Sequence, residues 1–568
     1  MQLSGSAAVC IQKGAYCMKK NLWAICYGIA LTAFTAYIAL DTFVLTDTYQ
    51  TGTTEMNTAM FEEFSASAVT QETTETAIAE TEVPVTEAQS FRSRKPEHSR
   101  HSQSDDTEIQ DVSEQPEETQ QIPENQGTDF NSYDDENISI TLTEYYENNS
   151  YQQIKNEYSG IYDGKNIIVI HAESLQTIAL EKTFEGVEVT PNINKLAKEG
   201  LYFSNFYSQV GVGTSSDAEF TFSTSLMPSS SGTVFVNYFD RKYITIQNQF
   251  KQKEYYTFSM HGNTGDFWNR ATMHENMGYD KFYSKSSFDI DETIGLGLSD
   301  KSFFRQVVEK IKKIDEEHTE PFYGTLISLT NHTPFSDLDL MDEYPTTWTL
   351  NINGESVTRN YINETTLGNY FRSVHYFDQA IGQFINDMDK EGLLDNTVIV
   401  IYGDHDARIS KKNYNILYNY DPYTDKIKKE SDEDYVDYND YMYKLDRKVP
   451  FIIWSKDKKI KKEVKTATGM IDAFPIIGNM FNVYSVYQLG TDTINAKDNT
   501  VVFTDGSYVT NKIYYNGQNG EIYSINGEAV DERYIDEKSE HANKIIEVSN
   551  NIITYDLIKE IEKKTSDE

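Results

Sequence analysis

The distribution of apolar and polar residues divides the chain into an apolar N-terminal stretch, a long polar segment and a region of alternating strand and helix patterns. Residues 22–40 form a stretch of 19 residues without a charge, just enough for a helix to cross a hydrocarbon core of about 30 Å. Residues 46–136 have no apolar periodicity and carry 22 acidic residues against four basic ones. Such a segment cannot bury enough surface to offset its conformational entropy, so we expect it to be disordered.

The region from about residue 138 onwards has the pattern of an α/β domain. Helical patterns include Pro191–Gly200, with proline in its first turn, and residues 367–391, which are followed by Gly392. Strands that alternate with helices predict a mainly parallel sheet sandwiched by helices. The apolar runs that we interpret as its strands are residues 166–170, 256–260, 322–329, 396–402 and 449–454.

The charges beside the apolar stretch predict its orientation in a membrane. Lys13, Lys19 and Lys20 precede it, whereas Asp41 and Asp47 follow it, so the positive-inside rule places the later residues outside the cell. The alternative is a cleaved signal peptide, but the apolar region is long for one, and we favour a retained single-pass anchor. The expected parts are a cytoplasmic N-terminus at 1–21, the transmembrane anchor at 22–45, a disordered acidic linker at 46–137, the α/β domain at 138–520 and a C-terminal segment with a helix at 521–568.

Charge and cysteine content exclude several classes of function. The net charge of −39 argues against a nucleic acid partner, because a polyanion needs a broad basic surface. The three cysteines all precede residue 30. The globular part therefore has neither a disulfide nor a thiolate metal site.

Polar residues follow four of the predicted strands at the points where these strands end. Because the carboxyl ends of parallel strands meet at one edge of a sheet, such residues converge on a single site. Carboxylate and imidazole groups together suit a borderline divalent cation. For any one strand end, a capped loop or a satisfied histidine is the simpler interpretation, but four ends at one edge favour a site. The residues are Glu173 after 166–170, His261 after 256–260, His332 after 322–329, and Asp404 with His405 after 396–402.

A fifth segment, residues 211–220, combines glycines with neighbouring hydroxyl groups. Its Ser/Thr-x-x-Glu spacing is a helix-start signature, and a hydroxyl at a helix N-terminus lies where a phosphate would bind. Thr214 and Ser215 therefore either cap the helix or, beside a metal that lowers a hydroxyl pKa, supply a nucleophile.

These segments together resemble the lipoteichoic acid synthases, the phosphoglycerol-transferase branch of the alkaline phosphatase/sulfatase superfamily. The resemblance runs from about residue 160 to 510. Besides Glu173 after the first strand, it rests on the motifs FYSQVGVGTSSDAEF (206–220), HGNTGDFWNR (261–270), SLTNHTPF (328–335) and IYGDH (401–405).

The resemblance implies an alkaline phosphatase-like fold and a metal-dependent transfer of glycerol phosphate. The donor would be phosphatidylglycerol, and the acceptor a glycolipid or a growing polyglycerol-phosphate chain, reached through a covalent phospho-enzyme. The enzyme would act outside the membrane of a Gram-positive-type cell. The family's metal is manganese, and magnesium or zinc would suit the same donors. The matching metal ligands are Glu173, Asp404, His405 and the nucleophile, and the matching glycerol-phosphate contacts are His261, Trp268, Arg270 and His332.

The chain departs from the family in its nucleophile segment, its membrane region and one pocket residue. Family members typically have Gly-Lys-Thr-Ser-Asp where this chain has Gly-Thr-Ser-Ser-Asp. Ungapped alignment places Ser215 at the nucleophilic position, with Thr214 as the alternative. The synthases usually have five transmembrane helices, whereas this chain shows one, and Asn263 replaces a carboxylate found in some members.

Other activities of the superfamily are alternatives. Attack by water would make the protein a phosphodiesterase, and a phosphoethanolamine transferase would share the scaffold. A sulfatase is disfavoured because its Cys/Ser-x-Pro-x-Arg motif does not occur. A surface module that kept the fold without catalysis is the non-enzymatic alternative, although every expected metal position holds a residue able to bind a metal.

Overall fold

The computed structural model describes residues 155–335, 337–527 and 529–567. The predicted N-terminus at 1–21, anchor at 22–45 and linker at 46–137 lie outside these residues. Within the described ranges, no helix combines the length and the apolar character needed to span a bilayer.

The described residues are built on an eight-stranded sheet with the strand order β17-β4-β16-β13-β1-β10-β6-β7. The strands in chain order are β1 (Asn166–Ala172), β4 (Leu201–Phe203), β6 (Tyr256–His261), β7 (Lys281–Tyr283), β10 (Phe322–Ile327), β13 (Thr397–Gly403), β16 (Phe451–Ser455) and β17 (Lys462–Val464). All neighbours pair in parallel except β16, which is antiparallel to both β13 and β4. The mainly parallel sheet predicted from the sequence is therefore confirmed.

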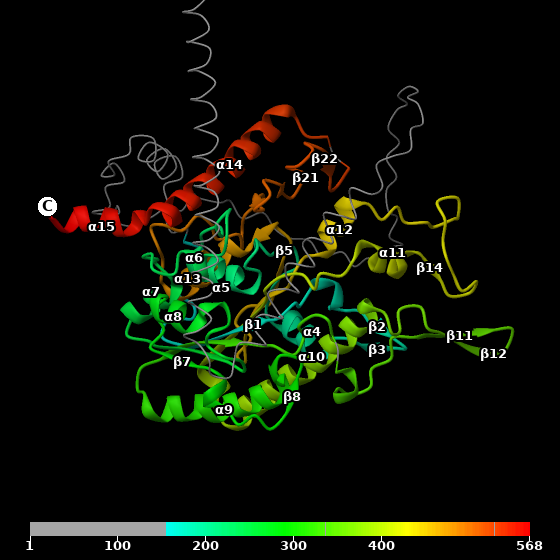
Figure 1. The fold of residues 1–568 in the computed structure, drawn as a ribbon, viewed down its shortest axis with the longest axis horizontal. Helices are drawn as coiled ribbons and strands as arrows, with labels where there is room; N and C mark the ends of the chain where they lie inside the picture. Colours follow the sequence, from blue (N-terminus) through cyan, green and yellow to red (C-terminus); the bar gives the residue numbers. More distant parts are fainter. Residues whose placement is uncertain (1–154, 336, 528, 568) are drawn as a thin grey trace, which may run out of the picture. The chain divides into compact units, whose positions relative to one another are not determined.

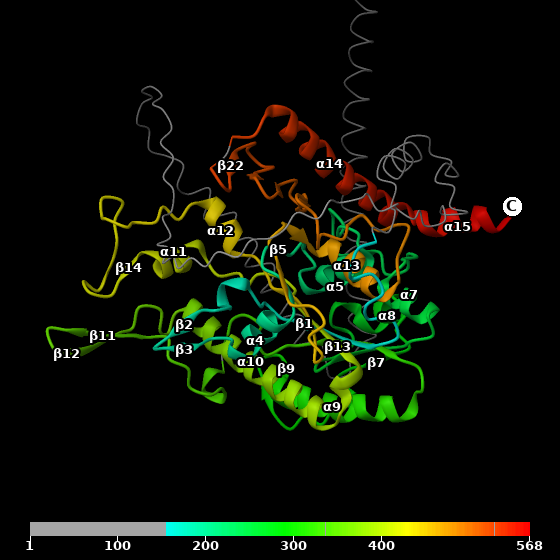
Figure 2. The same cartoon turned by 180° about the vertical axis from the view of Figure 1, so that it is seen from behind.

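Helices cover both faces of this sheet (Figures 1 and 2). One face packs against α4 (Pro191–Glu199), α9 (Asp300–Glu317) and α10 (Thr366–Lys390). The other packs against α5 (Ser215–Thr224), α7 (Ile246–Gln252), α8 (Arg270–Asn276), α13 (Ala473–Phe481) and α14 (Glu532–Tyr555).

Strand β1 shows how the sequence produces these two layers. Successive side chains of a strand point to opposite faces. Ile167 and Val169 accordingly lie in the core with α5 and α13, whereas Ile168 and Ile170 lie in the core with α9 and α10. A strand with apolar residues at every position is thus the one that both helical layers bury.

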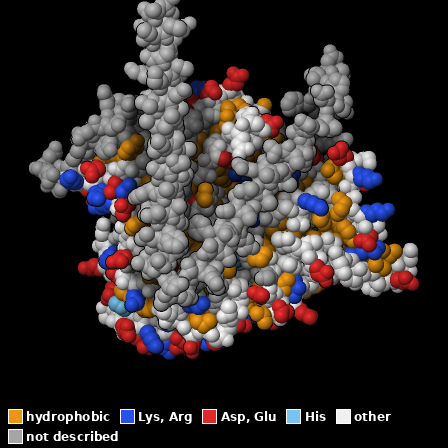
Figure 3. All heavy atoms as spheres, viewed as in Figure 1, with side chains coloured by type: hydrophobic (Ala, Val, Ile, Leu, Met, Phe, Trp, Pro, Cys, Tyr) orange, Lys and Arg blue, Asp and Glu red, His pale blue; other side chains and the backbone are white. Residues whose placement is uncertain are grey.

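Smaller elements surround this core. The remaining α-helices of the described residues are α6 (Val234–Asn237), α11 (Lys411–Asn419), α12 (Asp440–Asp446) and α15 (Leu557–Asp567). Short strands pair as β2 (Thr183–Phe184) with β3 (Val187–Glu188), β5 (Phe206–Tyr207) with β18 (Thr468–Gly469), β8 (Thr293–Ile294) with β9 (Gly297–Leu298), β11 (Trp348–Ile352) with β12 (Glu355–Arg359), and β14 (Tyr420–Asp421) with β15 (Lys426–Ile427). A four-stranded sheet contains β19 (Val501–Val502), β20 (Tyr508–Val509), β21 (Ile513–Tyr515) and β22 (Ile522–Ser524). On the face shown in Figure 3, acidic and basic side chains are interspersed among apolar ones.

Candidate active site

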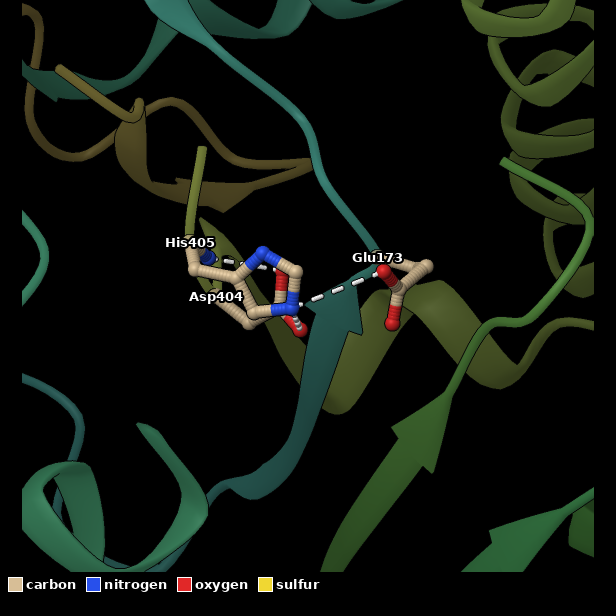
Figure 4. Close-up of side chains that lie close together, drawn as sticks. All are labelled: Glu173, Asp404 and His405. Carbon is tan, nitrogen blue, oxygen red and sulfur yellow. Dashed lines mark hydrogen bonds and ion pairs between the residues drawn. The ribbon is translucent and has the colours of Figure 1, made fainter. Parts of the chain in front are cut away.

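The pairing of β1 with β13 brings the first candidate ligands together. Ala172 and Gly403 are partners in this parallel ladder, so the residues that follow them, Glu173 and Asp404, leave the sheet side by side. With His405 they form a buried group whose ligand atoms all lie within 4.8 Å of one another. His405 Nε2 is 3.3 Å from Asp404 Oδ2 and 3.6 Å from Glu173 Oε1 (Figure 4).

The charges in this group fit a divalent cation. Burial alone would raise the pKa of Asp404, but His405 and His171 hold it below the usual range. Burial lowers the pKa of His405, yet the carboxylates of Asp404 and Glu173 raise it overall. Two buried carboxylates need a compensating positive charge. Carboxylate oxygens and an imidazole nitrogen are donors suited to manganese, magnesium or zinc.

A surrounding shell of hydrogen bonds orients Asp404. Its Oδ1 accepts the backbone N–H groups of Ser174 and His405, both at 2.7 Å. Its Oδ2 accepts Nε2–H of His171 at 3.0 Å, and Nδ1 of His171 in turn accepts the hydroxyl of Tyr402 at 2.7 Å. Sequence reasoning assigned no role to His171 or Tyr402. The signal was present for His171, because it precedes Glu173 by two positions beside the strand end.

Glu173 and His405 are oriented in the same way. Ser174 donates its hydroxyl to Glu173 Oε1 at 2.7 Å, and the Glu173 N–H donates to Ser328 Oγ at 2.9 Å. Nδ1–H of His405 donates to the carbonyl of Asp406 at 2.9 Å, which leaves Nε2 facing the site. Hydrogen bonds of this kind fix the tautomer and direction of residues that bind metals.

Helix α5 places Ser215 beside two of these residues, Glu173 and His405. Ser215 is the first residue of the helix, and its Oγ lies 3.1 Å from His405 Nε2 and 3.3 Å from Glu173 Oε2. Thr214 is the N-cap residue, with φ at 41° and no capping hydrogen bond from its side chain. The preceding loop is tied down by Asp217, which accepts the N–H groups of Gly211 and Gly213, each at 2.9 Å.

Arg270 and His261 form a second buried group. Nη1 of Arg270 lies 3.4 Å from Nε2 of His261, while Nδ1–H of His261 donates to the Ile327 carbonyl at 3.0 Å. Burial, together with the charge of Arg270, lowers the pKa of His261 to about 3. The ring is therefore neutral at neutral pH, with its proton on Nδ1.

Trp268 and His332, the other expected glycerol-phosphate contacts, are half-buried. Trp268 has φ at 56° in the turn before α8, and its ring packs against Phe267 at 5.7 Å. Nδ1–H of His332 donates to the carbonyl of Thr333 at 2.6 Å. Trp268 also packs against the apolar core that α5 and α13 enter, whereas Arg270 and Ser215 make polar contacts with distant parts of the chain.

Comparison with known proteins identifies the family that has this fold. The Sulfatase family model matches residues 165–483, and the chain belongs to this family. The fold is shared with a protein of the alkaline phosphatase superfamily from Vibrio parahaemolyticus, at a TM-score of 0.51 and 18% identity over 74% of this chain and 98% of that one.

Within the family, the chain is similar to lipoteichoic acid synthases. It is 35% identical over 435 residues to lipoteichoic acid synthase 2 of Bacillus subtilis (strain 168), which covers 75% of this chain and 62% of that synthase. The crystal structure of the lipoteichoic acid synthase LtaP from Listeria monocytogenes matches with a TM-score of 0.60 and 26% identity, over 70% of this chain and 94% of that one. The chain thus spans less than two thirds of the length of the Bacillus synthase. These similarities confirm the resemblance that was inferred from the sequence motifs.

Proposed function

We propose that the protein transfers glycerol phosphate from phosphatidylglycerol to a glycolipid or polyglycerol-phosphate acceptor of the cell envelope. The observation that carries this proposal is the position of Ser215 Oγ, within 3.3 Å of both Glu173 and His405. The similarity to lipoteichoic acid synthases supports the choice of donor and acceptor.

Glu173, Asp404, His405 and Ser215 are the residues that would hold a divalent metal, with manganese as the first choice and magnesium or zinc as alternatives. When bound, such an ion lowers the pKa of a hydroxyl and stabilises negative charge on phosphate oxygens. The donor set fits this role, because Glu173, Asp404 and His405 lie together and two of them, Glu173 and His405, contact the Ser215 hydroxyl.

In the first step, Ser215 Oγ attacks the phosphorus atom of phosphatidylglycerol and loses its proton. The bond between phosphorus and the diacylglycerol oxygen breaks, and that oxygen leaves and takes up a proton. Glycerol phosphate is then an ester of Ser215. Arg270 neutralises the phosphate charge through paired hydrogen bonds, and His261, Trp268 and His332 contact the glycerol phosphate.

In the second step, a hydroxyl group of the acceptor attacks the same phosphorus atom and loses its proton, while the bond from phosphorus to the Ser215 oxygen breaks and that oxygen takes up a proton. Attack by water instead would release free glycerol phosphate and make the protein a phosphodiesterase. The reaction would take place outside the membrane if residues 22–45 anchor the chain as their sequence predicts.

The test is to incubate the full chain with labelled phosphatidylglycerol and Mn²⁺ and to measure the release of diacylglycerol. We expect turnover by the wild type and by Thr214→Ala, and a loss of at least about 10³-fold in Ser215→Ala, because the nucleophile is removed. Labelled glycerol phosphate bound to the protein would identify the covalent step. Free glycerol phosphate as the sole product would favour the phosphodiesterase.

Three outcomes would contradict the proposal. An inactive Thr214→Ala beside an active Ser215→Ala would move the nucleophile to Thr214. Turnover of phosphatidylethanolamine but not of phosphatidylglycerol would replace the substrate with that of a phosphoethanolamine transferase. Absence of turnover with Mn²⁺, Mg²⁺ and Zn²⁺ alike would favour a non-catalytic surface module.

A further inference from the structure

Glu219 connects the helix of the proposed nucleophile to Arg270. It lies on α5, one turn after Ser215, and its side chain is 5% exposed. Its Oε1 accepts Nε–H and Nη2–H of Arg270, both at 2.8 Å. Its Oε2 accepts Nε2–H of His274 at 2.8 Å. Arg270 and His274 are one turn apart on α8, so this single carboxylate joins α5 to α8 at two points.

The bonds to Arg270 leave a defined part of its guanidinium group for a ligand. Arginine has five N–H donors in a rigid plane. Glu219 accepts one from Nε and one from Nη2, and Nη1 faces the unprotonated Nε2 of His261 at 3.4 Å. One N–H on each terminal nitrogen then remains, which is the pair needed to bind two oxygens of one phosphate.

His274, the other partner of Glu219, binds the second oxygen of its carboxylate. Nδ1 of His274 accepts the hydroxyl of Ser259 at 2.9 Å, so its Nε2 carries the proton that is donated to Glu219. Burial alone would raise the pKa of Glu219, but Arg270 and His274 hold it well below its usual value. The carboxylate therefore stays ionised, and Arg270 cannot turn away without leaving a buried charge unpaired, which is costly.

We propose that Glu219 is a positioning residue that holds Arg270, relative to Ser215, in the orientation needed to bind the phosphate of the substrate. The proposal rests on the proposed transferase function for its reaction, but the geometry that carries it involves only α5, α8 and His261. Sequence reasoning considered Glu219 only as part of a helix-start signature.

The experiment is a double-mutant cycle on the full chain, with Glu219→Gln, Arg270→Gln and the double variant assayed for release of diacylglycerol from phosphatidylglycerol. We expect Glu219→Gln to lower kcat/KM by about 10- to 100-fold, the cost of misplacing a group that binds the reacting phosphate. Because Glu219 would act through Arg270, the double variant should differ from Arg270→Gln by less than about twofold. Glu275→Gln, at an exposed position of α8, is the matched control and should keep wild-type kinetics.

A merely structural role gives a different result. The decreases in kcat/KM of the two single variants would then multiply in the double variant, and the decrease in Glu219→Gln would be accompanied by a lower melting temperature that explains it. Either finding overturns the proposal. A wild-type value of kcat/KM in Glu219→Gln also overturns it. If Glu219→Gln does not fold, Glu219→Asp replaces it in the cycle, because it keeps the charge but draws the carboxylate back by one methylene.

The cycle also separates this proposal from the proposed function. If the wild type does not cleave phosphatidylglycerol, the transferase function fails, and the same four proteins are titrated with inorganic phosphate by calorimetry. Weaker binding in Glu219→Gln, with no further weakening in the double variant beyond Arg270→Gln, supports the positioning role on its own. Unchanged binding in Glu219→Gln, or additive losses, overturns it.

Discussion

Gly213 lies in the loop that leads into α5, where a side chain has no room. A Cβ atom at this position would collide with the Asp217 carboxylate and with Thr233 Oγ1. Asp217 also accepts the N–H of Gly213 itself, so the loop, the carboxylate and the start of the helix form one packed unit. The position of Ser215 Oγ therefore depends on a residue that touches neither metal nor substrate.

Replacing Gly213 by alanine should impair the proposed reaction more than the fold. The added methyl group pushes the loop away from Asp217 and displaces Ser215, and a shift of about 1 Å at a reacting group costs on the order of 10²-fold in rate. We expect kcat for diacylglycerol release to fall by that order, with a cooperative melting transition retained. Val212→Ala, at the exposed neighbouring position, should remain within about twofold of the wild type, since surface substitutions have small effects. Wild-type kcat in Gly213→Ala would show that the loop is free to move.

At the residue scale, the sequence predicted what lies next to a strand end and missed what depends on packing between helices. Glu173, Asp404 and His405 directly follow β1 and β13, so the rule for parallel sheets was enough to bring them together. Ser215 was preferred to Thr214 from an alignment, and the structure places Ser215 beside the ligand group. Glu219 and His274 were missed, because nothing in their local sequence shows that α5 and α8 face each other.

Helix α4 receives its N-terminal cap from a distant helix. Asp378 on α10 accepts the backbone N–H groups of Asn192 and Ile193, at 3.1 and 2.8 Å. The N-cap residue Thr190 makes no capping bond, because its hydroxyl bonds to Ala179 and Asn194 instead. Pro191 correctly predicted where this helix begins. The capping residue lies 186 positions away in the sequence, which no local pattern can show.

Asp378→Ala should therefore destabilise the domain. It leaves N–H groups at the start of α4 without a partner, and each unsatisfied buried group costs about 1–3 kcal/mol. We expect the free energy of unfolding to fall by about 3 kcal/mol in urea titrations. Asp389→Ala on the same helix removes only a surface ion pair with Lys456, and its effect should stay below about 1 kcal/mol. Equal effects of the two substitutions would contradict this assignment.

Helix α14 carries a pH-sensitive contact. Its apolar residues Ala542, Ile545 and Val548 pack into the core that α5 and α13 also enter. Beside them, burial and then the charge of Lys538 lower the pKa of His541 to about 4. The folded state thus favours the neutral ring. The stability that this provides is fully present above pH 6.5, the value of a free histidine, and is lost as the pH falls through about 4.

His541→Gln should make the domain less sensitive to acid. The difference between the two pKa values corresponds to about 3 kcal/mol. We expect the free energy of unfolding of the wild type, relative to that of the variant, to decrease by an amount of this order between pH 7 and pH 4. Denaturant titrations of both proteins at these two pH values measure it, and a constant difference between the proteins would show that His541 is solvated when folded.

At the scale of the whole molecule, alternating strand and helix patterns were enough to predict the layers but not the order of the strands. Each of the strands β1, β6, β10 and β13 coincides with a strand that the sequence predicted, and all four pair in parallel. The antiparallel direction of β16 was not predicted. Residues 404–450 stay at the edge of the sheet where β13 ends, so β16 begins there and runs back in the opposite direction. Hydrophobic periodicity carries no information on the direction of a strand.

The candidate ligands join the central strands β1 and β13 to helix α5, so metal binding should stabilise the whole molecule. An ion that binds only the folded state adds about 2.7 kcal/mol at a concentration of 100 Kd. We expect Mn²⁺ to raise the melting temperature of the wild type and EDTA to reverse the rise. Glu173→Gln should lose most of this response, because one of the two buried carboxylates of the group is gone.

The metal-free proteins provide the decisive comparison. Without an ion, Glu173 and Asp404 place two negative charges beside one imidazole, and removing one charge relieves this repulsion. In EDTA, Glu173→Gln should therefore melt at or above the temperature of the wild type, and the order should reverse in Mn²⁺. Asp389→Asn, which changes an exposed carboxylate that pairs with Lys456, should follow the wild type in both buffers. If Glu173→Gln is less stable in EDTA and responds to Mn²⁺ as the wild type does, Glu173 is a structural hydrogen-bond acceptor and not a metal ligand.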